Sequence, residues 1–254
     1  MSHGSPTPGY VWKPARQWFR WHLKRQIDLR VEGFEYVPRD GAAMLVARHF
    51  HHYWDGAIFS ATFERPIHIV VGLDWSQGIG RKAIEALCRA ADFPIILRTG
   101  TDPSTPASAP GPAVDATDAR RYLRQAVDET TALLRAGELM IVFPEGYPTI
   151  DPHASRKPDR DAFLPFQPGF VQLVAQAQRG GTPPVPIIPV GFEYASLDPK
   201  DKRWRVVVRF GEPVFLAPGQ DRAALLRDVE SRVKALSGYL PDHGVATARR
   251  PNHS

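Results

Sequence analysis

The chain has 254 residues, enough for one large α/β domain or two small ones, and we read it as a single domain. Its 43% hydrophobic and 23% charged residues are ordinary for a globular protein, which excludes wholesale disorder and a fibrous architecture. A net charge of +5 favours partners that carry phosphate, such as anionic membranes or nucleic acids, over basic partners.

The cysteine content and the apolar runs bear on the cellular compartment. Cys88 is the single cysteine and lies in a helical pattern, where a lone cysteine usually packs as a small apolar residue, so a reducing cytoplasm is favoured. The longest apolar runs, Ile67 to Leu73 and Leu139 to Phe143, are far shorter than the roughly 18 to 20 residues that cross a bilayer. The amino terminus lacks the apolar core of a signal peptide, so we expect neither a transmembrane helix nor secretion.

The first structured element is expected to be an amphipathic helix over residues 10–31 that lies at a membrane interface, after a disordered segment over residues 1–9. Apolar side chains recur at helical spacing from Ala15 to Ile27. The helix carries aromatic residues beside cations, as interfacial helices do: Trp12, Trp18, Phe19 and Trp21 beside Lys13, Arg16, Arg20, Lys24 and Arg25. A helix packed on its own domain, with its basic side solvated, is the alternative.

Residues 32–240 alternate between short aliphatic runs and amphipathic stretches, which is typical of an α/β fold. Candidate strands are 42–48, 67–73, 93–97, 139–143, 185–191 and 205–210, and candidate helices are 56–63, 81–91, 118–136, 169–179 and 221–237. We expect one domain with a central mixed, largely parallel sheet flanked by helices. Two proline-containing segments, 100–116 and 148–161, are expected to be loops, the second a possible substrate lid, and residues 241–254 a disordered tail.

The stretch LVARHFHHYWDG leads from an apolar strand into three histidines and an aspartate: His49, His51, His52 and Asp55. A histidine bonded to a carboxylate can take a proton from a hydroxyl, because the carboxylate fixes the ring tautomer and stabilises the imidazolium. The chain has no Gly-x-Ser-x-Gly nucleophile, so such a base would activate the hydroxyl of the substrate itself. The alternatives are a zinc site, and hence a metal-dependent hydrolase, or a solvated turn without a role.

A second motif, LMIVFPEGYPT, places Pro144, Glu145 and Gly146 directly after an apolar strand. Gly146 permits a positive φ or a close backbone approach, and Glu145 is expected at the carboxyl end of the strand, where α/β folds bind ligands. Most Pro-Glu-Gly tripeptides are ordinary tight turns, but the preceding strand and the histidine cluster favour a functional role here.

These motifs together resemble those of the phospholipid/glycerol acyltransferase family, in particular the lysophosphatidate acyltransferases. The family's four ordered blocks have counterparts in RHFHHYWD, in FPIILR ending at Arg98, in FPEGYP and in VPIIPVGF from Val185 to Phe192. The later Phe-Gly-Glu-Pro of the family is matched by Phe210 to Pro213, and the resemblance spans about residues 33–214.

The resemblance implies an enzyme that moves a fatty acyl group from acyl-CoA or acyl carrier protein to a hydroxyl of a glycerolipid, without a covalent enzyme intermediate. It implies no cofactor and no metal. The expected partners are membrane lipids and a lysolipid acceptor, with the protein peripheral or monotopic at the cytoplasmic face of a membrane. A non-catalytic lipid-binding module is the alternative. Nucleic-acid binding is not expected, because the basic residues are spread out and no recognised binding motif accompanies them.

The resemblance also assigns roles, with departures from the family pattern. The family places four residues between its histidine and aspartate, whereas five residues separate His49 from Asp55 and three separate His51 from Asp55. We expect His49 to be the general base, because it ends the strand, with a one-residue bulge in the turn, Asp55 as its partner and His51 as the reserve candidate. Substrate binding is assigned to Arg98, Glu145, Gly146 and Tyr147.

The last departure concerns the acceptor. Tyr147 and Pro148 stand where the family has Thr-Arg, which removes a cation expected near the acceptor phosphate. Arg98 remains. We therefore expect no strong preference for lysophosphatidate, unless a cation of the following loop replaces the lost one, the candidates being Arg156, Lys157 and Arg160.

Overall fold

A computed structural model describes residues 9–73, 78–98, 115–150, 157, 159, 162–180, 182–198 and 201–238. The first elements are α1 (Gly9–Gln26), β1 (Ile27–Glu32), the 3-10 helix η1 (Phe34–Tyr36), β2 (Ala43–Ala47) and α2 (Trp54–Thr62). They are followed by β3 (Ile67–Ile69), β4 (Val71–Gly72), α3 (Gly78–Ala90), β5 (Ile95–Ile96), α4 (Ala116–Arg135) and β6 (Leu139–Val142). The last are α5 (Gly169–Ala177), β7 (Ile187–Asp198), β8 (Asp201–Phe210) and α6 (Arg222–Leu236).

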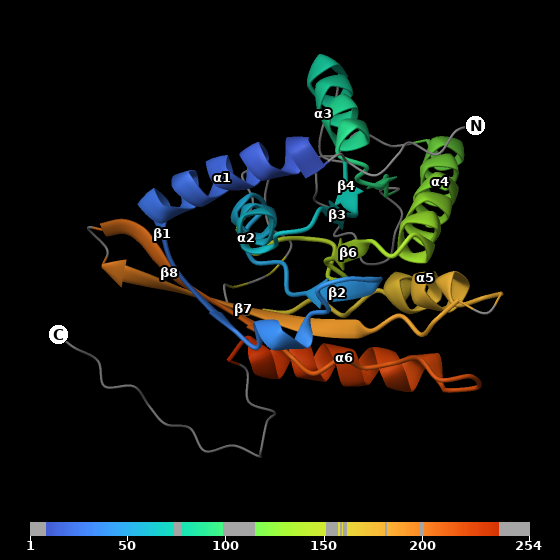
Figure 1. The fold of residues 1–254 in the computed structure, drawn as a ribbon. Helices are drawn as coiled ribbons and strands as arrows, with labels where there is room; N and C mark the ends of the chain where they lie inside the picture. Colours follow the sequence, from blue (N-terminus) through green and yellow to red (C-terminus); the bar gives the residue numbers. More distant parts are fainter. Residues whose placement is uncertain are drawn as a thin grey trace.

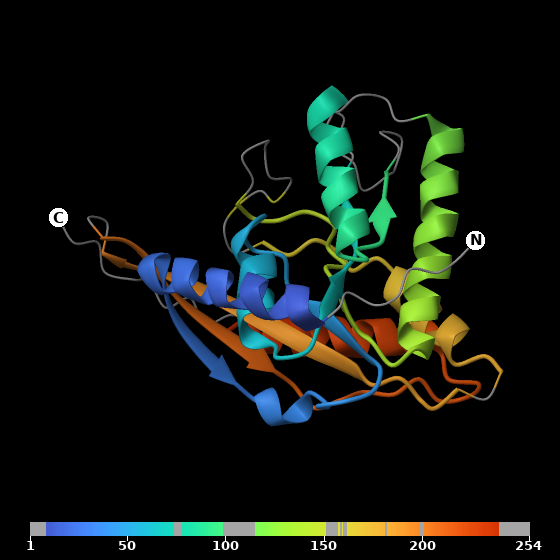
Figure 2. The same ribbon diagram turned by 45° about the horizontal axis from the view of Figure 1, so that its top comes forward.

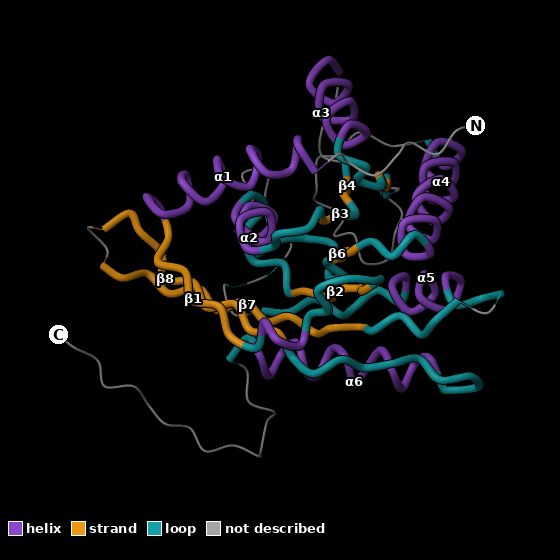
Figure 3. The backbone as a smooth tube through the Cα atoms, in the orientation of Figure 1, coloured by secondary structure: helices purple, strands orange, loops and turns teal. Residues whose placement is uncertain are grey.

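The main sheet has the strand order β1-β8-β7-β2-β6-β3, and β4 pairs with β5 in a small second sheet. Its neighbouring strands are parallel except β7 and β8, which are antiparallel, so the expected mixed, largely parallel sheet is confirmed. The helices α1 and α2 lie on one side of the main sheet and α6 lies on the other (Figures 1 and 3). The expected strand over residues 67–73 is divided between the two sheets.

The central strands are continuous aliphatic runs because both faces of the sheet are covered. Every residue of β2 and β6 is buried. Successive side chains of a strand point to opposite faces, so Leu45 of β2 joins the core beneath α1 and α2, whereas Met44 joins the core against α5 and α6. Two hydrophobic cores therefore hold the strand that carries the histidine motif at its end.

Helix α1 ends at Gln26, so the expected helix over residues 10–31 is wrong at its carboxyl end. Residues 27–32 form β1, which pairs with β8 in parallel. Ile27 is buried as the first residue of that strand, although its position also fits the helical spacing of the preceding residues. The expected disordered segments, 1–9 and 241–254, lie outside the described residues apart from Gly9, as does most of the expected loops 100–116 and 148–161.

Helix α1 packs on its own domain along one side and is exposed along the other. Trp12 and Leu23 are buried in the core next to α2. The indoles of Trp18 and Trp21 are 52% and 53% exposed, on a helix whose exposed residues also include Lys13, Arg20, Lys24 and Arg25. Among the helices of the described ranges, none combines the length and the apolar character that crossing a membrane requires.

An extension of the fold, formed by α3, β4, β5 and α4, stands at one edge of the main sheet (Figure 2). Its small core contains Leu73, Ile95, Leu97 and the buried thiol of Cys88. Burial raises the pKa of that thiol, which therefore packs as an apolar side chain, as the sequence predicts. Arg98 lies two residues after the end of β5, so the extension places this cation beside the main sheet.

Candidate active site

The two sequence motifs meet where the neighbouring strands β2 and β6 end. These strands are parallel, so their carboxyl ends lie at the same edge of the sheet. Beyond the strands, the backbone N–H of Thr149 donates to the carbonyl of His49 at 3.2 Å, and that of Ile150 donates to the carbonyl of Phe50 at 2.7 Å. The segments that follow the two strands are therefore joined by backbone hydrogen bonds.

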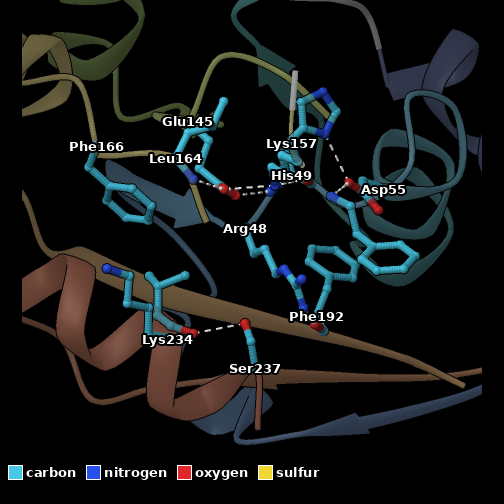
Figure 4. Close-up of polar contacts among 12 residues, drawn as sticks. Arg48, His49, Asp55, Glu145, Lys157, Leu164, Phe166, Phe192, Lys234 and Ser237 are labelled. Atoms are coloured by element: carbon cyan, nitrogen blue, oxygen red, sulfur yellow. Dashed lines mark hydrogen bonds and ion pairs between the residues drawn. The ribbon is translucent and has the colours of Figure 1, made fainter. Parts of the chain in front are cut away.

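His49 and Asp55 form a hydrogen-bonded pair, with Nδ1 of the imidazole 2.9 Å from Oδ2 of the carboxylate (Figure 4). Asp55 lies in the first turn of α2 and its side chain has no exposed surface, whereas the side chain of His49 is 16% exposed. The ring of Phe143 stacks on the imidazole with the centroids 4.3 Å apart. An ionised Asp55 places the ring proton on Nδ1 and leaves Nε2 to accept a proton from another molecule.

The turn between these residues wraps around the carboxylate of Asp55. Oδ2 accepts the backbone N–H groups of Phe50 at 2.7 Å and of His51 at 3.0 Å, in addition to the imidazole of His49. The residues between His49 and Asp55 therefore fold around the same carboxylate oxygen that the imidazole contacts.

His51 has a different environment. Its Nδ1 accepts the backbone N–H groups of Tyr53 at 3.2 Å and of Trp54 at 3.3 Å, at the start of α2. Burial lowers the pKa of His51 to about 4; the Asp55 carboxylate opposes this shift, while His52 and His49 add to it. His51 is therefore neutral near pH 7 and supports a helix start, whereas the structure places His49 against Asp55.

The remaining histidine of the motif also binds backbone. Nδ1 of His52 lies 3.2 Å from the carbonyl oxygen of Ile150, and the His52 ring stacks on that of His51. Each of the three histidines thus has a different partner. Across the described ranges, no three His, Cys, Asp or Glu side chains converge in a way that could hold a metal ion. The zinc site considered from the sequence is not assembled by these side chains.

Glu145 faces the interior, with no exposed side-chain surface. Its Oε1 accepts the backbone N–H of His49 at 2.9 Å, and its Oε2 accepts that of Leu164 at 3.0 Å and pairs with Nζ of Lys157 at 2.7 Å (Figure 4). The carboxylate thus links the turn after β6 to the residue that carries the imidazole. Glu145 therefore holds the turn after β2 against the turn after β6, and the acceptor contact expected from the sequence stays a prediction.

Lys157 completes this link, since its ammonium also donates to the carbonyl of His49 at 2.7 Å. Burial lowers the pKa of Lys157, and the Glu145 carboxylate opposes that shift. Lys157 was one candidate to replace the missing acceptor cation. The ammonium of Lys157, however, is enclosed beside Glu145 and His49. Arg156 and Arg160, the other candidates, lie outside the described residues.

Arg98, Gly146 and Tyr147 lie together at the turn after β6. Nη1 of Arg98 donates to the carbonyl of Gly146, and the guanidinium lies 3.9 Å from the ring centroid of Tyr147. Gly146 has a φ of +74°, and a Cβ there would lie 2.8 Å from Nη1 of Arg98. Two features therefore require a glycine at position 146, as the sequence predicts: the positive φ and the close approach of the arginine.

Sequence reasoning missed Tyr194, whose hydroxyl donates to Oδ1 of Asp55 at 2.6 Å. Tyr194 belongs to β7, where it shares its side of the strand with Val190 and Phe192, all three in the same core. A tyrosine on the inward side of a strand needs a hydrogen-bond partner, and that signal was present in the sequence. The partner could not be found from sequence, because it lies 139 positions earlier in the chain.

Comparison with known proteins adds a family and a fold. The acyltransferase family model matches residues 28–193, well over half of the chain. No curated protein matches. Among solved structures, the chain is similar to the crystal structure of the 1-acyl-sn-glycerophosphate (LPA) acyltransferase PlsC from Thermotoga maritima, with a TM-score of 0.60 and 18% identity over 90% of this chain and 79% of that one. At that identity the likeness shows the fold alone.

Proposed function

Because this chain belongs to the acyltransferase family and is an O-acyltransferase, we propose that it moves a fatty acyl group from acyl-CoA or acyl carrier protein to a hydroxyl of a glycerolipid. The hydrogen bond between His49 and Asp55 is the observation that carries this proposal. The pair lies at the strand ends of an α/β sheet, and Nε2 of His49 is the ring nitrogen that the carboxylate does not use. The thioester is a co-substrate, and the proposed reaction needs no cofactor.

In the proposed reaction, Nε2 of His49 takes the proton of the acceptor hydroxyl as the oxygen attacks the carbonyl carbon of the thioester. The resulting tetrahedral intermediate collapses by breaking the carbon–sulfur bond, and the leaving thiolate takes the proton from the imidazolium. The products are an ester and a free thiol. Asp55 stabilises the imidazolium while it exists, and general base catalysis of this kind contributes typically about a hundredfold to ten-thousandfold in rate.

We propose that Arg98 meets the head group of the acceptor. Its guanidinium lies at the turn after β6, where the family motif places the acceptor site, and Tyr147 packs against it. The solved neighbour is named as an acyltransferase of 1-acyl-sn-glycerophosphate, which supports a lysolipid acceptor. A single arginine can bind phosphate in a bidentate way, but Lys157 is enclosed beside Glu145, so we expect no strong preference for an acceptor with a terminal phosphate.

We also propose peripheral membrane attachment through α1, on the cytoplasmic face. The exposed indoles of Trp18 and Trp21 supply amphipathic rings of the kind found at headgroup level. The guanidinium of Arg25 lies 3.9 Å above the Trp21 ring, so cation and aromatic share one side of the helix. Each cation near an anionic surface adds roughly 1 kcal/mol of attraction. A lipid acceptor would then reach the protein without leaving the membrane.

The test is acyl transfer by the purified chain, followed as thiol release and ester formation with palmitoyl-CoA and lysophosphatidate in anionic vesicles. His49→Ala and Asp55→Asn are each expected to lower transfer by at least about a hundredfold. His52→Ala is the matched control, because this exposed ring in the same turn bonds only to the Ile150 carbonyl among the described residues. Vesicle binding without thiol release, with either CoA or carrier-protein donors, would instead identify a lipid-binding module.

A further inference from the structure

We propose that Tyr194 is a positioning residue of the catalytic pair: its hydroxyl holds the Asp55 carboxylate in the orientation that His49 needs. The inference rests on the proposed function, because it assigns Tyr194 to the same proton transfer. The inference goes beyond the proposed function because it adds a third residue, from β7, to a pair formed by the turn after β2 and by α2. No block of the sequence motifs contains this residue.

The distribution of donors around Asp55 carries the first step of the argument. Oδ2 accepts three hydrogen bonds, from the imidazole of His49 and from the backbone of Phe50 and His51. Oδ1 accepts a hydrogen bond from the Tyr194 hydroxyl at 2.6 Å. Within the described part of the chain, this hydroxyl is the donor to Oδ1. A donor fixed on Oδ1 restrains rotation about the bond that joins the carboxylate to Cβ, and so keeps Oδ2 directed at the imidazole.

The second step is that the Tyr194 ring is itself held in place. It stacks on the ring of Phe50 with the centroids 4.3 Å apart and the planes at 9°, and it meets the edge of Trp204 at 6.0 Å. Phe50 also donates its backbone N–H to the other carboxylate oxygen. Phe50, which packs on the tyrosine, therefore belongs to the turn that encloses the carboxylate. The donors to both carboxylate oxygens are held together by this stacking.

The third step concerns charge. A fully buried carboxylate stays ionised only if hydrogen bonds and nearby charges offset its lost hydration. Burial and the Asp55 carboxylate raise the pKa of Tyr194 well above its usual value, so the hydroxyl keeps its proton and remains a donor. Among the described residues, the charged or titratable groups that interact with Asp55 or Tyr194 include Arg48, His49, His51 and Lys157. Arg48 lies close by, since its Nη1 donates to the Phe192 carbonyl at 3.3 Å.

These contacts predict a specific kinetic effect. Tyr194→Phe removes one oxygen and keeps the ring that stacks on Phe50, so the packing survives while the donor to Oδ1 is lost. We expect kcat to fall about tenfold to hundredfold, the range of a lost hydrogen bond to a charged group. KM should stay within about twofold, because Tyr194 is buried behind Asp55 and acts through it rather than on the substrate.

Tyr122→Phe is a matched control, because it removes the same kind of bond elsewhere. The Tyr122 hydroxyl donates to Oε1 of Glu85 at 2.7 Å, between α4 and α3 in the extension. Wild type, Tyr194→Phe and Tyr122→Phe are compared for kcat, KM and thermal unfolding. Tyr122→Phe should leave kcat unchanged. A wild type that transfers no acyl group would overturn the proposed function, whereas an unchanged kcat in Tyr194→Phe beside an active wild type would overturn this inference alone.

A double-mutant cycle separates positioning from a general effect on stability. If Tyr194 acts through the carboxylate, adding Tyr194→Phe to Asp55→Asn should lower kcat by less than about twofold further, measured at high enzyme concentration. A purely structural role would lower kcat by the same factor in both backgrounds. Equal factors in the two backgrounds therefore contradict the inference even if the single variant is slow.

Discussion

The ammonium of Lys157 and the carboxylate of Glu145 lie 2.7 Å apart, and neither side chain has any surface exposed to solvent. The same ammonium donates to the carbonyl of His49, while the same carboxylate accepts the N–H of that residue. The backbone of His49 is thus bound on both sides by one ion pair. Removing one partner of a buried pair is strongly destabilising, because the other charge is left without compensation.

Lys157→Met should therefore lower the free energy of unfolding by about 3 to 5 kcal/mol, measured by urea denaturation. The matched control is Lys234→Met. Lys234 pairs with Glu230 at 2.6 Å on α6, but those side chains are 39% and 19% exposed, so its loss should cost less than about 1 kcal/mol. Adding Glu145→Gln to Lys157→Met should restore part of the stability, since neither charge of the pair remains. A double variant less stable than Lys157→Met would contradict this explanation.

His51 predicts how stability responds to acid. Its pKa is about 4 in the folded chain and ordinarily 6.5, so between these values the unfolded chain binds a proton that the folded chain does not. The contribution of neutral His51 to the free energy of unfolding is complete above about pH 6.5 and is lost as the pH falls towards 4. Because the ring is only half buried, we expect a loss of about 1 to 2 kcal/mol, less than the full shift would give.

His51→Asn provides the comparison for this effect, because asparagine offers an acceptor at the start of α2 but does not titrate. Urea unfolding at pH 7.5 and pH 4.5 gives the free energy of unfolding of both proteins. Wild type should lose more of this free energy than His51→Asn when the pH falls from 7.5 to 4.5. Equal losses would show that His51 does not titrate in this window.

Arg98, at the proposed acceptor site, predicts the acceptor selectivity of the enzyme. Wild type should prefer lysophosphatidate over a lysophospholipid with a larger head group by less than about a hundredfold. Arg98→Lys should raise KM for lysophosphatidate about tenfold, because lysine lacks the planar fork of arginine, whereas exposed Arg124→Lys on α4 should not. Steady-state kinetics with both acceptors measures this. A preference above a hundredfold that Arg156→Ala with Arg160→Ala abolishes would place the missing cation in that loop instead.

The exposed side of α1 predicts membrane binding. Trp18→Ser with Trp21→Ser should shift the protein from sedimented anionic vesicles to the supernatant, and high salt should do so in part. Phe215→Ser is the control, since Phe215 is 50% exposed outside α1. Phe19 is unsuited to this test because it packs against the core, and deleting the helix would remove buried Leu23. Unchanged sedimentation of the tryptophan variant would show that attachment lies elsewhere.

Several features of the site could be predicted from sequence because they are encoded locally. The aliphatic runs that became β2 and β6, the positive φ of Gly146 and the proximity of His49 to Asp55 each depend on a few consecutive residues. The strand β1 could not be predicted from local sequence. Ile27 fits the helical spacing of the preceding residues, and it is the pairing with β8 that makes this segment a strand.

What the sequence by itself determined is the family, the α/β class and the candidate residues that follow β2, since these come from the order of motifs and from residue types. The tertiary structure decided which groups surround those candidate residues. Glu145 reaches the His49 backbone across 96 positions and Tyr194 reaches Asp55 across 139. Such partners depend on strand order, which places β7 and β6 on either side of β2, and no local pattern specifies it. The physical reason is that a buried polar group accepts whichever donor the packed chain brings within hydrogen-bond distance.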